Sequence, residues 1–347
     1  MSKQISFKVI LITLAIVVTL LTFSGVLWAK ANDADSLEKV KAIHDKHTNQ
    51  LLTIKGVEGT AIGFDANNHL SVKIFAAGPK VADIPKDLDG IPTEIIVTGK
   101  FRALRQEWVK QGRTSGGKVA PTSRFPRPVP IGVSTGNAGE CSAGTIGCRV
   151  KDTAGNVYAL SNNHVYALEN EAEIGSEVAQ PGVYDTGCSY SSSNVIGTLA
   201  DFVWLEFNND VNNYIDAAIA LSSTANLGNA TPSNGYGKPR SAAGEASLNQ
   251  KVQKYGRTTS LTRGTVTGLN ASIWITYDSG AALFTDQIIV QSGKPFIKAG
   301  DSGSLLVTDP GRQPVGLLFA GDTSGKYAIA NRIMPVLDTF GVTVDGE

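Results

Sequence analysis

From Ile131 onward the sequence consists of short apolar runs separated by Gly, Asn and Asp, with no long helical repeat before the C-terminal end. Many short strands with turn residues between them are typical of antiparallel barrels or a sandwich, so the fold class is mainly β. The expected strands are residues 145–150, 157–160, 196–205, 217–221, 252–255, 264–269, 273–277, 287–291, 303–307 and 315–319. Those up to residue 221 would form one barrel and the later ones a second. Residues 335–340 predict a final helix, with Gly341 just past its end.

A serine between glycines, Gly-Asp-Ser-Gly at residues 300–303, interrupts the strands of the second barrel. The glycines allow a tight turn with positive φ and leave the Ser302 hydroxyl accessible. The same turn can direct the N–H groups of Gly300 and Ser302 to one point, as an oxyanion hole requires. Such residues are also common in ordinary turns, so the motif needs partners before it indicates a nucleophile.

A histidine and an aspartate supply those partners. A serine hydroxyl needs an imidazole base, and a carboxylate must hold the tautomer of that base. The chain has four histidines, and only His164 lies in the expected barrels. Asp216 closes a polar loop and opens an apolar strand. The expected catalytic residues are therefore His164, Asp216 and Ser302, in that order along the chain.

Gly-Asp-Ser-Gly and this order resemble the trypsin/chymotrypsin-like serine proteases. The Gly-Arg-Thr-Thr sequence at residues 256–259 resembles the bacterial members that are similar to α-lytic protease. The resemblance covers about residues 131–342. It implies two six-stranded antiparallel β-barrels with a C-terminal helix, and a serine endopeptidase (a hydrolase) that forms an acyl-enzyme on polypeptide substrates without a cofactor or metal. The alternative is a catalytically silent trypsin-like fold that serves as a binding or cell-wall-associated module.

The chain departs from the family pattern in places. Asn162 and Asn163 precede the histidine where the common animal enzymes have alanines and a cysteine, and Ser304 replaces a second glycine. No Ile-Val-Gly-Gly terminus is present, so Asp301 is not expected to pair with a newly cut N-terminus.

The resemblance also implies a specificity pocket whose floor lies six residues before the nucleophile. The substrate-binding residues it implies are Phe296, Phe319, Ala320 and Gly321. An apolar floor predicts a preference for small or medium apolar side chains. A shift of the floor to Pro295 or Ile297 would leave this prediction unchanged, whereas Asp322 reaching in would favour basic side chains.

The N-terminus predicts export. Lys3 and Lys8 precede an uncharged apolar stretch over residues 9–28, and Ala-Lys-Ala follows it at residues 29–31. This is typical of a cleaved signal peptide over residues 1–31, although the stretch is also long enough for an uncleaved membrane anchor. We expect a secreted or periplasmic monomer that contacts a membrane only through this segment if it is uncleaved. A formal net charge of zero gives no reason to expect nucleic-acid binding.

Residues 32–109 predict a small α+β domain with a helix over residues 36–52. Strands are expected at residues 59–64, 69–75 and 93–99. His44 and His47 have a metal-ligand spacing, but on a Lys-rich helix they are expected to be solvated. The domain resembles segments that act as folding aids or inhibitors in some secreted bacterial serine proteases, while an accessory domain for substrate or wall binding fits equally well.

Residues 110–130 predict an exposed linker, and residues 131–347 the protease domain. Of the three cysteines, Cys141 and Cys188 lie in loop-like sequence and could form a disulfide. Cys148 lies in an alternating strand pattern and could be a buried thiol, but the sequence alone allows all three pairings.

Overall fold

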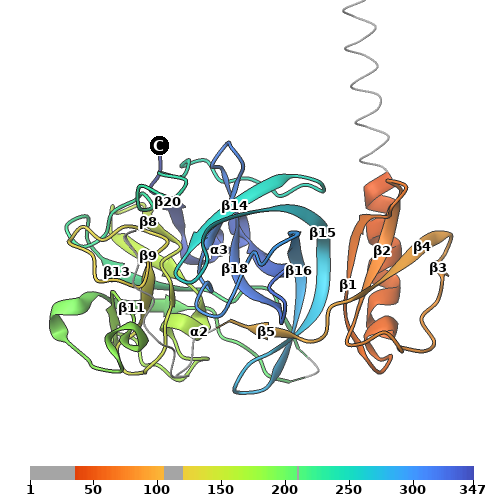
Figure 1. Ribbon diagram of the computed structural model, residues 1–347, viewed down its shortest axis with the longest axis horizontal. Helices are drawn as coiled ribbons and strands as arrows, with labels where there is room; N and C mark the ends of the chain where they lie inside the picture. Colours follow the sequence, from red (N-terminus) through yellow and green to blue (C-terminus); the bar gives the residue numbers. More distant parts are fainter. Residues whose placement is uncertain (1–35, 105–119, 209–210) are drawn as a thin grey trace, which may run out of the picture.

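The computed structural model describes residues 36–104, 120–208 and 211–347. The body is mainly β, with two curled antiparallel sheets side by side and a small N-terminal unit beyond the second (Figure 1). This confirms the predicted fold class, the trypsin-like double barrel with a C-terminal helix. The predicted signal peptide, residues 1–31, lies outside the described residues, as does the linker up to residue 119.

The first sheet has the order β20-β8-β9-β13-β11-β10-β6-β7. Its strands are β6 (Ser134–Asn137), β7 (Gly144–Thr145), β8 (Cys148–Asp152), β9 (Val157–Ser161), β10 (Glu177–Ala179), β11 (Val195–Phe202), β13 (Ala218–Ser222) and β20 (Val342–Val344). One helical turn, α2 (Asn163–Tyr166), follows β9, and two 3₁₀ turns, η1 (Val183–Thr186) and η2 (Ser192–Asn194), flank the edge. The sheet exceeds the six expected strands because short segments pair at its edges.

The second sheet is built around a long hairpin. Its strands are β14 (Lys251–Gly256), β15 (Ser260–Thr276), β16 (Ala281–Gln291), β17 (Leu305–Thr308), β18 (Pro314–Asp322) and β19 (Tyr327–Arg332), with β12 (Asn212–Asn213) beside β16. The two strands expected at residues 264–269 and 273–277 are one strand, because Asn270 takes positive φ (52°) and the ladder continues through bulges.

One buried apolar cluster spans both barrels. Leu305 and Leu317 of the second sheet belong to the same buried apolar cluster as Leu160 and Ala218 of the first. The C-terminal helix α3 (Ile333–Phe340) packs on this cluster and ends at Gly341, which takes the left-handed conformation expected of a residue past a helix. Because the barrels meet along this contact, residues at their junction come from distant parts of the chain.

The N-terminal unit joins the second sheet edge to edge. It contains a helix over residues 36–52 and the strands β1 (Val57–Phe64), β2 (Leu70–Ala76), β3 (Asp87–Leu88) and β4 (Ile91–Val97). Strand β1 pairs antiparallel with β15, with one register shift between Thr60 and Ile62, so this unit and the second barrel share one sheet. The short strand β5 (Phe101–Ala103) follows and reaches the body, where it pairs with β15 and β18 (Figure 1).

His44 does not lie on a solvated face. The ring is fully buried between Thr60 of β1, Thr48 of its own helix and Asn270 of β15. The prediction was wrong because the helix packs on β1, and β1 in turn lies on the barrel. His47 contacts Asp89 at 2.9 Å.

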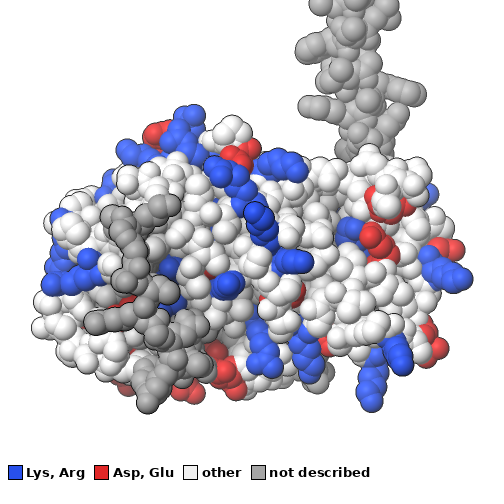
Figure 2. Space-filling view, viewed as in Figure 1, with Lys and Arg blue, Asp and Glu red and all other residues white. Residues whose placement is uncertain are grey.

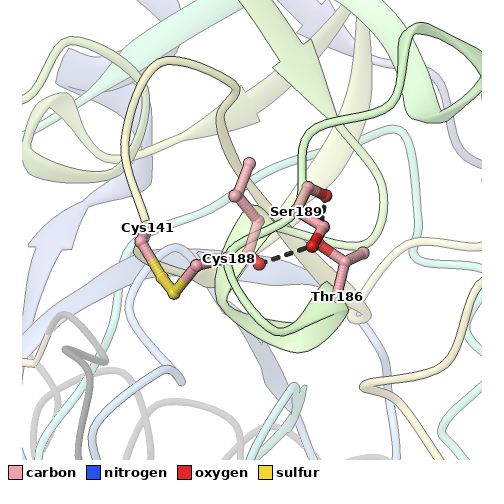
Figure 3. Close-up of a disulfide and its surroundings, with 5 residues drawn as sticks. Cys141, Thr186, Cys188 and Ser189 are labelled. Atoms are coloured by element: carbon pink, nitrogen blue, oxygen red, sulfur yellow. Dashed lines mark hydrogen bonds between the residues drawn. A yellow bond between two sulfur atoms is a disulfide. The ribbon is translucent and has the colours of Figure 1, made fainter.

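Cys141 and Cys188 form a disulfide, as the sequence allowed, with their Cα atoms 5.0 Å apart (Figure 3). Cys148 is a buried free thiol, and burial raises its pKa to about 12. Lys and Arg are interspersed with Asp and Glu over the face shown in Figure 2. In the described part of the chain, no helix has the length and apolarity needed to cross a membrane.

Candidate active site

His164 and Asp216 form a buried pair at the junction of the barrels. His164 lies on α2, directly after β9, and Asp216 lies just before the neighbouring strand β13. The ring Nδ1 lies 2.5 Å from Asp216 Oδ2, and the His164 backbone N–H donates to Oδ1 at 3.3 Å. An imidazole that carries its proton on Nδ1, facing this carboxylate, has Nε2 left to accept a proton.

Further side chains fix this carboxylate. The Tyr277 hydroxyl donates to Asp216 Oδ2 at 2.8 Å, and burial, with the nearby Asp216 charge, raises the Tyr277 pKa well above its ordinary value. The phenol therefore stays a proton donor. Asn331 accepts from the Asp216 backbone N–H at 3.1 Å and donates to its carbonyl at 3.1 Å. Asp216 is thus held in both backbone and side chain.

The Ser302 turn depends on its two glycines. Gly300 and Gly303 have φ values of +92° and +90°. A Cβ on Gly303 would lie 2.2 Å from Ser161 Oγ, and one on Gly300 would lie 2.6 Å from Thr258 Oγ1. Neither position accepts a side chain, which explains why the motif needs glycine at both places.

Asp301 anchors the turn from within. Its carboxylate accepts from the backbone N–H groups of Thr258 and Thr259, at 2.8 and 3.1 Å, and lies 3.4 Å from Lys254 Nζ. Thr258 and Thr259 belong to the Gly-Arg-Thr-Thr segment, and Lys254 lies just before it in β14. Arg257 of the same segment is ion-paired with Asp185 at 2.5 Å. Asp301 is therefore satisfied without a newly cut N-terminus.

The first barrel positions the serine turn. Thr145, at the end of β7, donates its backbone N–H to Ser302 O and its hydroxyl to Gly300 O, each at 2.8 Å. A Cβ on the adjacent Gly144 would contact both Val165 of α2, at 2.5 Å, and Ser302 O, at 3.1 Å. The turn that carries Ser302 and the helix that carries His164 are thus neighbours across the barrel junction.

Ser302 and His164 do not form a hydrogen bond with each other. The Ser302 hydroxyl donates to Phe319 O at 3.0 Å. His164 Nε2 is buried and has no hydrogen-bond partner within the described ranges. Both side chains are fully buried. The structure brings the three expected catalytic residues to one place, with the hydroxyl proton turned to a carbonyl oxygen.

The chain's own residues Phe101–Leu104 lie along β18, next to the Ser302 turn. Strand β5 pairs antiparallel with β18 in the register Ala103 to Ala320 and Arg102 to Gly321. The next residue, Leu104, donates its N–H to Phe319 O at 3.2 Å and accepts from the Gly300 N–H at 2.7 Å. Leu104 is therefore bound on both sides of its Cα by the residues next to the serine.

Some of the residues expected to line the specificity pocket lie close to Leu104. Phe296 and Ile297 are fully buried, and Leu104 packs against their cluster. A Cβ on Gly321 would lie 3.1 Å from Leu104 Cδ1. Phe319 contributes its carbonyl, which accepts the Ser302 hydroxyl, while its ring packs on Phe284 with 4.8 Å between ring centres.

The other two pocket predictions fall on strand β18. Ala320 belongs to the same core cluster as the Phe319 ring. Asp322 accepts hydrogen bonds from Ser324 and from the backbone N–H of Tyr327 at 2.8 Å, which hold a turn.

Tyr277 and Leu104 were not predicted from the sequence as residues of this site, and neither were Asn331 and Thr145. Tyr277 lies in a strand-like run that gives no sign of a buried carboxylate partner. Leu104 lies at the end of the N-terminal unit, and nothing in its own segment indicates the cleft. Within the described residues, no three His, Cys, Asp or Glu side chains gather as metal ligands would.

No protein-family model matches the sequence, and no curated protein matches it. In structure, the chain resembles bacterial serine proteases. A glutamic acid-specific serine protease has 22% identity and a TM-score of 0.45, with 62% of this chain and all (100%) of that one covered. Thermobifida fusca Protease A has 20% identity and a TM-score of 0.46, with 63% and 100% covered. Nocardiopsis protease has 18% identity and a TM-score of 0.45, with 62% and 99% covered. These TM-scores are below 0.5, and the identities are below 25%, so the likeness does not extend to the chemistry of the site.

Proposed function

We propose that this protein is a serine endopeptidase. Ser302 is the nucleophile, His164 the general base, Asp216 the group that orients the base, and the N–H groups of Gly300 and Ser302 form the oxyanion hole. One observation supports this most strongly. A peptide carbonyl, that of Leu104, lies 2.7 Å from the Gly300 N–H, in the turn that carries the buried serine. This distance is the one expected between an oxyanion-hole donor and the oxygen of a reacting peptide.

In the proposed reaction, the Ser302 hydroxyl rotates from Phe319 O toward His164 and attacks the substrate carbonyl carbon. His164 Nε2 takes the hydroxyl proton and then gives it to the leaving amine. Asp216, held by Tyr277 and Asn331, stabilises the imidazolium that forms between these steps. A water molecule, activated by the same imidazole, hydrolyses the acyl-enzyme.

We further propose that the enzyme is exported through residues 1–31 and cuts after small or medium apolar side chains. The disulfide between Cys141 and Cys188 supports an oxidising compartment. Phe296 and Ile297 support an apolar pocket. Under this proposal residues 32–109 and 110–130 are a separate domain and a linker, and residues 131–347 are the protease domain.

Covalent labelling tests the proposal. The chain is incubated with a peptidyl phosphonate that carries a leucine-like side chain, and the labelled peptide is identified by mass spectrometry. We expect the label on Ser302 and none in Ser302→Ala. Ser304→Ala is the matched control, because it removes another buried hydroxyl of the same turn, whose bond is to Asp301 O. Labelling equal in Ser302→Ala and the parent chain, or labelling absent from the parent chain, would mean a silent fold.

A further inference from the structure

We infer that the segment Phe101–Leu104 occupies the substrate cleft of its own chain as a substrate, and that the enzyme cuts the peptide bond after Leu104. This inference rests on the proposed function, since it uses the same serine. It assigns a self-processing site to the N-terminal unit and a leucine to the first specificity pocket.

The backbone of the segment makes the contacts that a substrate needs. The Leu104 N–H donates to Phe319 O at 3.2 Å, and the Leu104 carbonyl accepts from the Gly300 N–H at 2.7 Å. Phe319 O also accepts the Ser302 hydroxyl at 3.0 Å, so Leu104 and Ser302 share an acceptor. The Gly300 N–H thus polarises the Leu104 carbonyl beside the nucleophile. A segment that merely covered the cleft would not need this contact with Gly300.

The preceding residues add a strand to β18. Ala103 pairs with Ala320, Arg102 with Gly321 and Phe101 with Asp322, in antiparallel register. Phe101 is fully buried and meets Phe75 of β2 edge to face, at 5.7 Å between ring centres. Strand addition gives affinity through the main chain and leaves selectivity to the pockets for alternate side chains.

The Leu104 side chain is apolar, as is the pocket that it contacts. It packs on the cluster that contains Phe296 and Ile297, and it lies against Gly321, where any Cβ would lie 3.1 Å from its Cδ1. A charged side chain there would lose its hydration without a partner. Leucine is therefore the kind of residue that the pocket accepts at the cleaved position.

The N-terminal unit holds the segment in place. β1 pairs with β15, and β5 pairs parallel with β15 at Ile275 and Thr276. A substrate tethered in this way has a high effective concentration, so it competes with external peptides until it is cut. The unit therefore delays activity as well as supplying the first substrate.

In the reaction, the Ser302 oxygen bonds to the Leu104 carbonyl carbon, and the bond from that carbon to the Arg105 nitrogen breaks. The hydroxyl proton passes through His164 to this nitrogen, which leaves as a new amino terminus. Water then releases Leu104 as a carboxylate and restores the Ser302 hydroxyl. The step consumes one water molecule and no other reactant.

The ends created by this cleavage test the inference. The purified full chain and its variants are incubated, and the fragments are identified by intact mass and N-terminal sequencing. We expect a fragment that begins at Arg105 from the parent chain and none from Ser302→Ala. Leu104→Asp should slow this cut about a hundredfold or more. Val97→Asp is the matched control, because it places the same charge at an exposed apolar residue of β4, outside the cleft, and should leave the cut unchanged.

Two outcomes separate this inference from the proposed function. A chain that takes the phosphonate on Ser302 and hydrolyses added peptides, yet is cut elsewhere or not at all, overturns the self-processing site and leaves the endopeptidase standing. A chain that is neither cut nor labelled overturns both. Equal cutting of Leu104→Asp and the parent chain also overturns the assignment of Leu104.

Discussion

At the scale of single residues, the site is organised by what holds Asp216. His164 and Tyr277 hydrogen-bond to the Asp216 carboxylate, and Asn331 hydrogen-bonds to the Asp216 backbone. A buried charge of this kind is stable only while its oxygens are satisfied. The proposed catalysis therefore depends on Tyr277, a positioning residue that itself touches no substrate.

Tyr277→Phe should lower kcat about ten- to a hundredfold and leave KM unchanged, because it removes one charge-assisted hydrogen bond but keeps the ring. Steady-state kinetics on a peptide substrate measure this split. Tyr255→Phe is the matched control, since it removes a hydroxyl bonded to Asn234, outside the site. An unchanged kcat in Tyr277→Phe, or a rise in KM alone, would contradict the positioning role.

Ser302→Ala and His164→Ala should each lower kcat by roughly 10⁶, and the double variant should be scarcely slower than either. The reason is that the base acts only through the nucleophile. Single-turnover hydrolysis by the three variants gives the comparison. Losses that add in the double variant would show that His164 does not serve Ser302.

At the scale of elements, the contact between β1 and β15 joins the N-terminal unit to the body. Gly59 pairs with Ile273, and a Cβ on Gly59 would lie 2.7 Å from Ile273 Cγ1 and 2.9 Å from Ser272 O. The two strands can approach this closely only because Gly59 has no side chain.

Gly59→Val should lower the free energy of unfolding by about 1–3 kcal/mol through this overpacking. Denaturant unfolding in the Ser302→Ala background measures the change without self-cleavage. Gly78→Val is the control, because nothing lies within 4 Å of a Cβ there. Equal effects of the two substitutions would mean that the β1–β15 contact does not stabilise the chain.

The sequence predicted the strands and helices that carry a local signal, such as alternating apolar residues or a helix cap. β9, β14 and α3 lie close to their expected ranges, because alternation or a cap marks them. β5 was not predicted, since three residues carry no periodicity and its register comes from pairing with two distant strands. Likewise, the order of His164, Asp216 and Ser302 indicated a shared site, but no local pattern indicated that Leu104 bonds to Gly300 and Phe319.

At the scale of the whole molecule, we expect His44 to make the attachment of the N-terminal unit sensitive to acid, because its buried ring joins that unit to β15. Burial lowers its pKa below the ordinary value of 6.5. Asp45 and Asn270 face Nδ1, while Thr60 and Thr48 face Nε2. The Asp45 carboxylate favours protonation, whereas burial and Lys41 oppose it and prevail.

Since the folded state favours neutral His44, its contribution to stability is complete above pH 6.5 and is lost as the pH falls through the lowered pKa. The thermal midpoint of the Ser302→Ala chain should therefore fall between pH 7 and 5, and by less in His44→Asn. His69→Asn, at an exposed histidine, is the control. The same pH slope in all three proteins would exclude His44 as the cause.

Capture of the acyl-enzyme would identify the nucleophile itself. The purified chain is mixed with a leucine ester, quenched in acid during turnover and digested for mass spectrometry. We predict one acyl group on the peptide that contains Ser302, and its disappearance as the ester is consumed. Turnover with no adduct, or an adduct on another residue, would contradict Ser302 as the nucleophile.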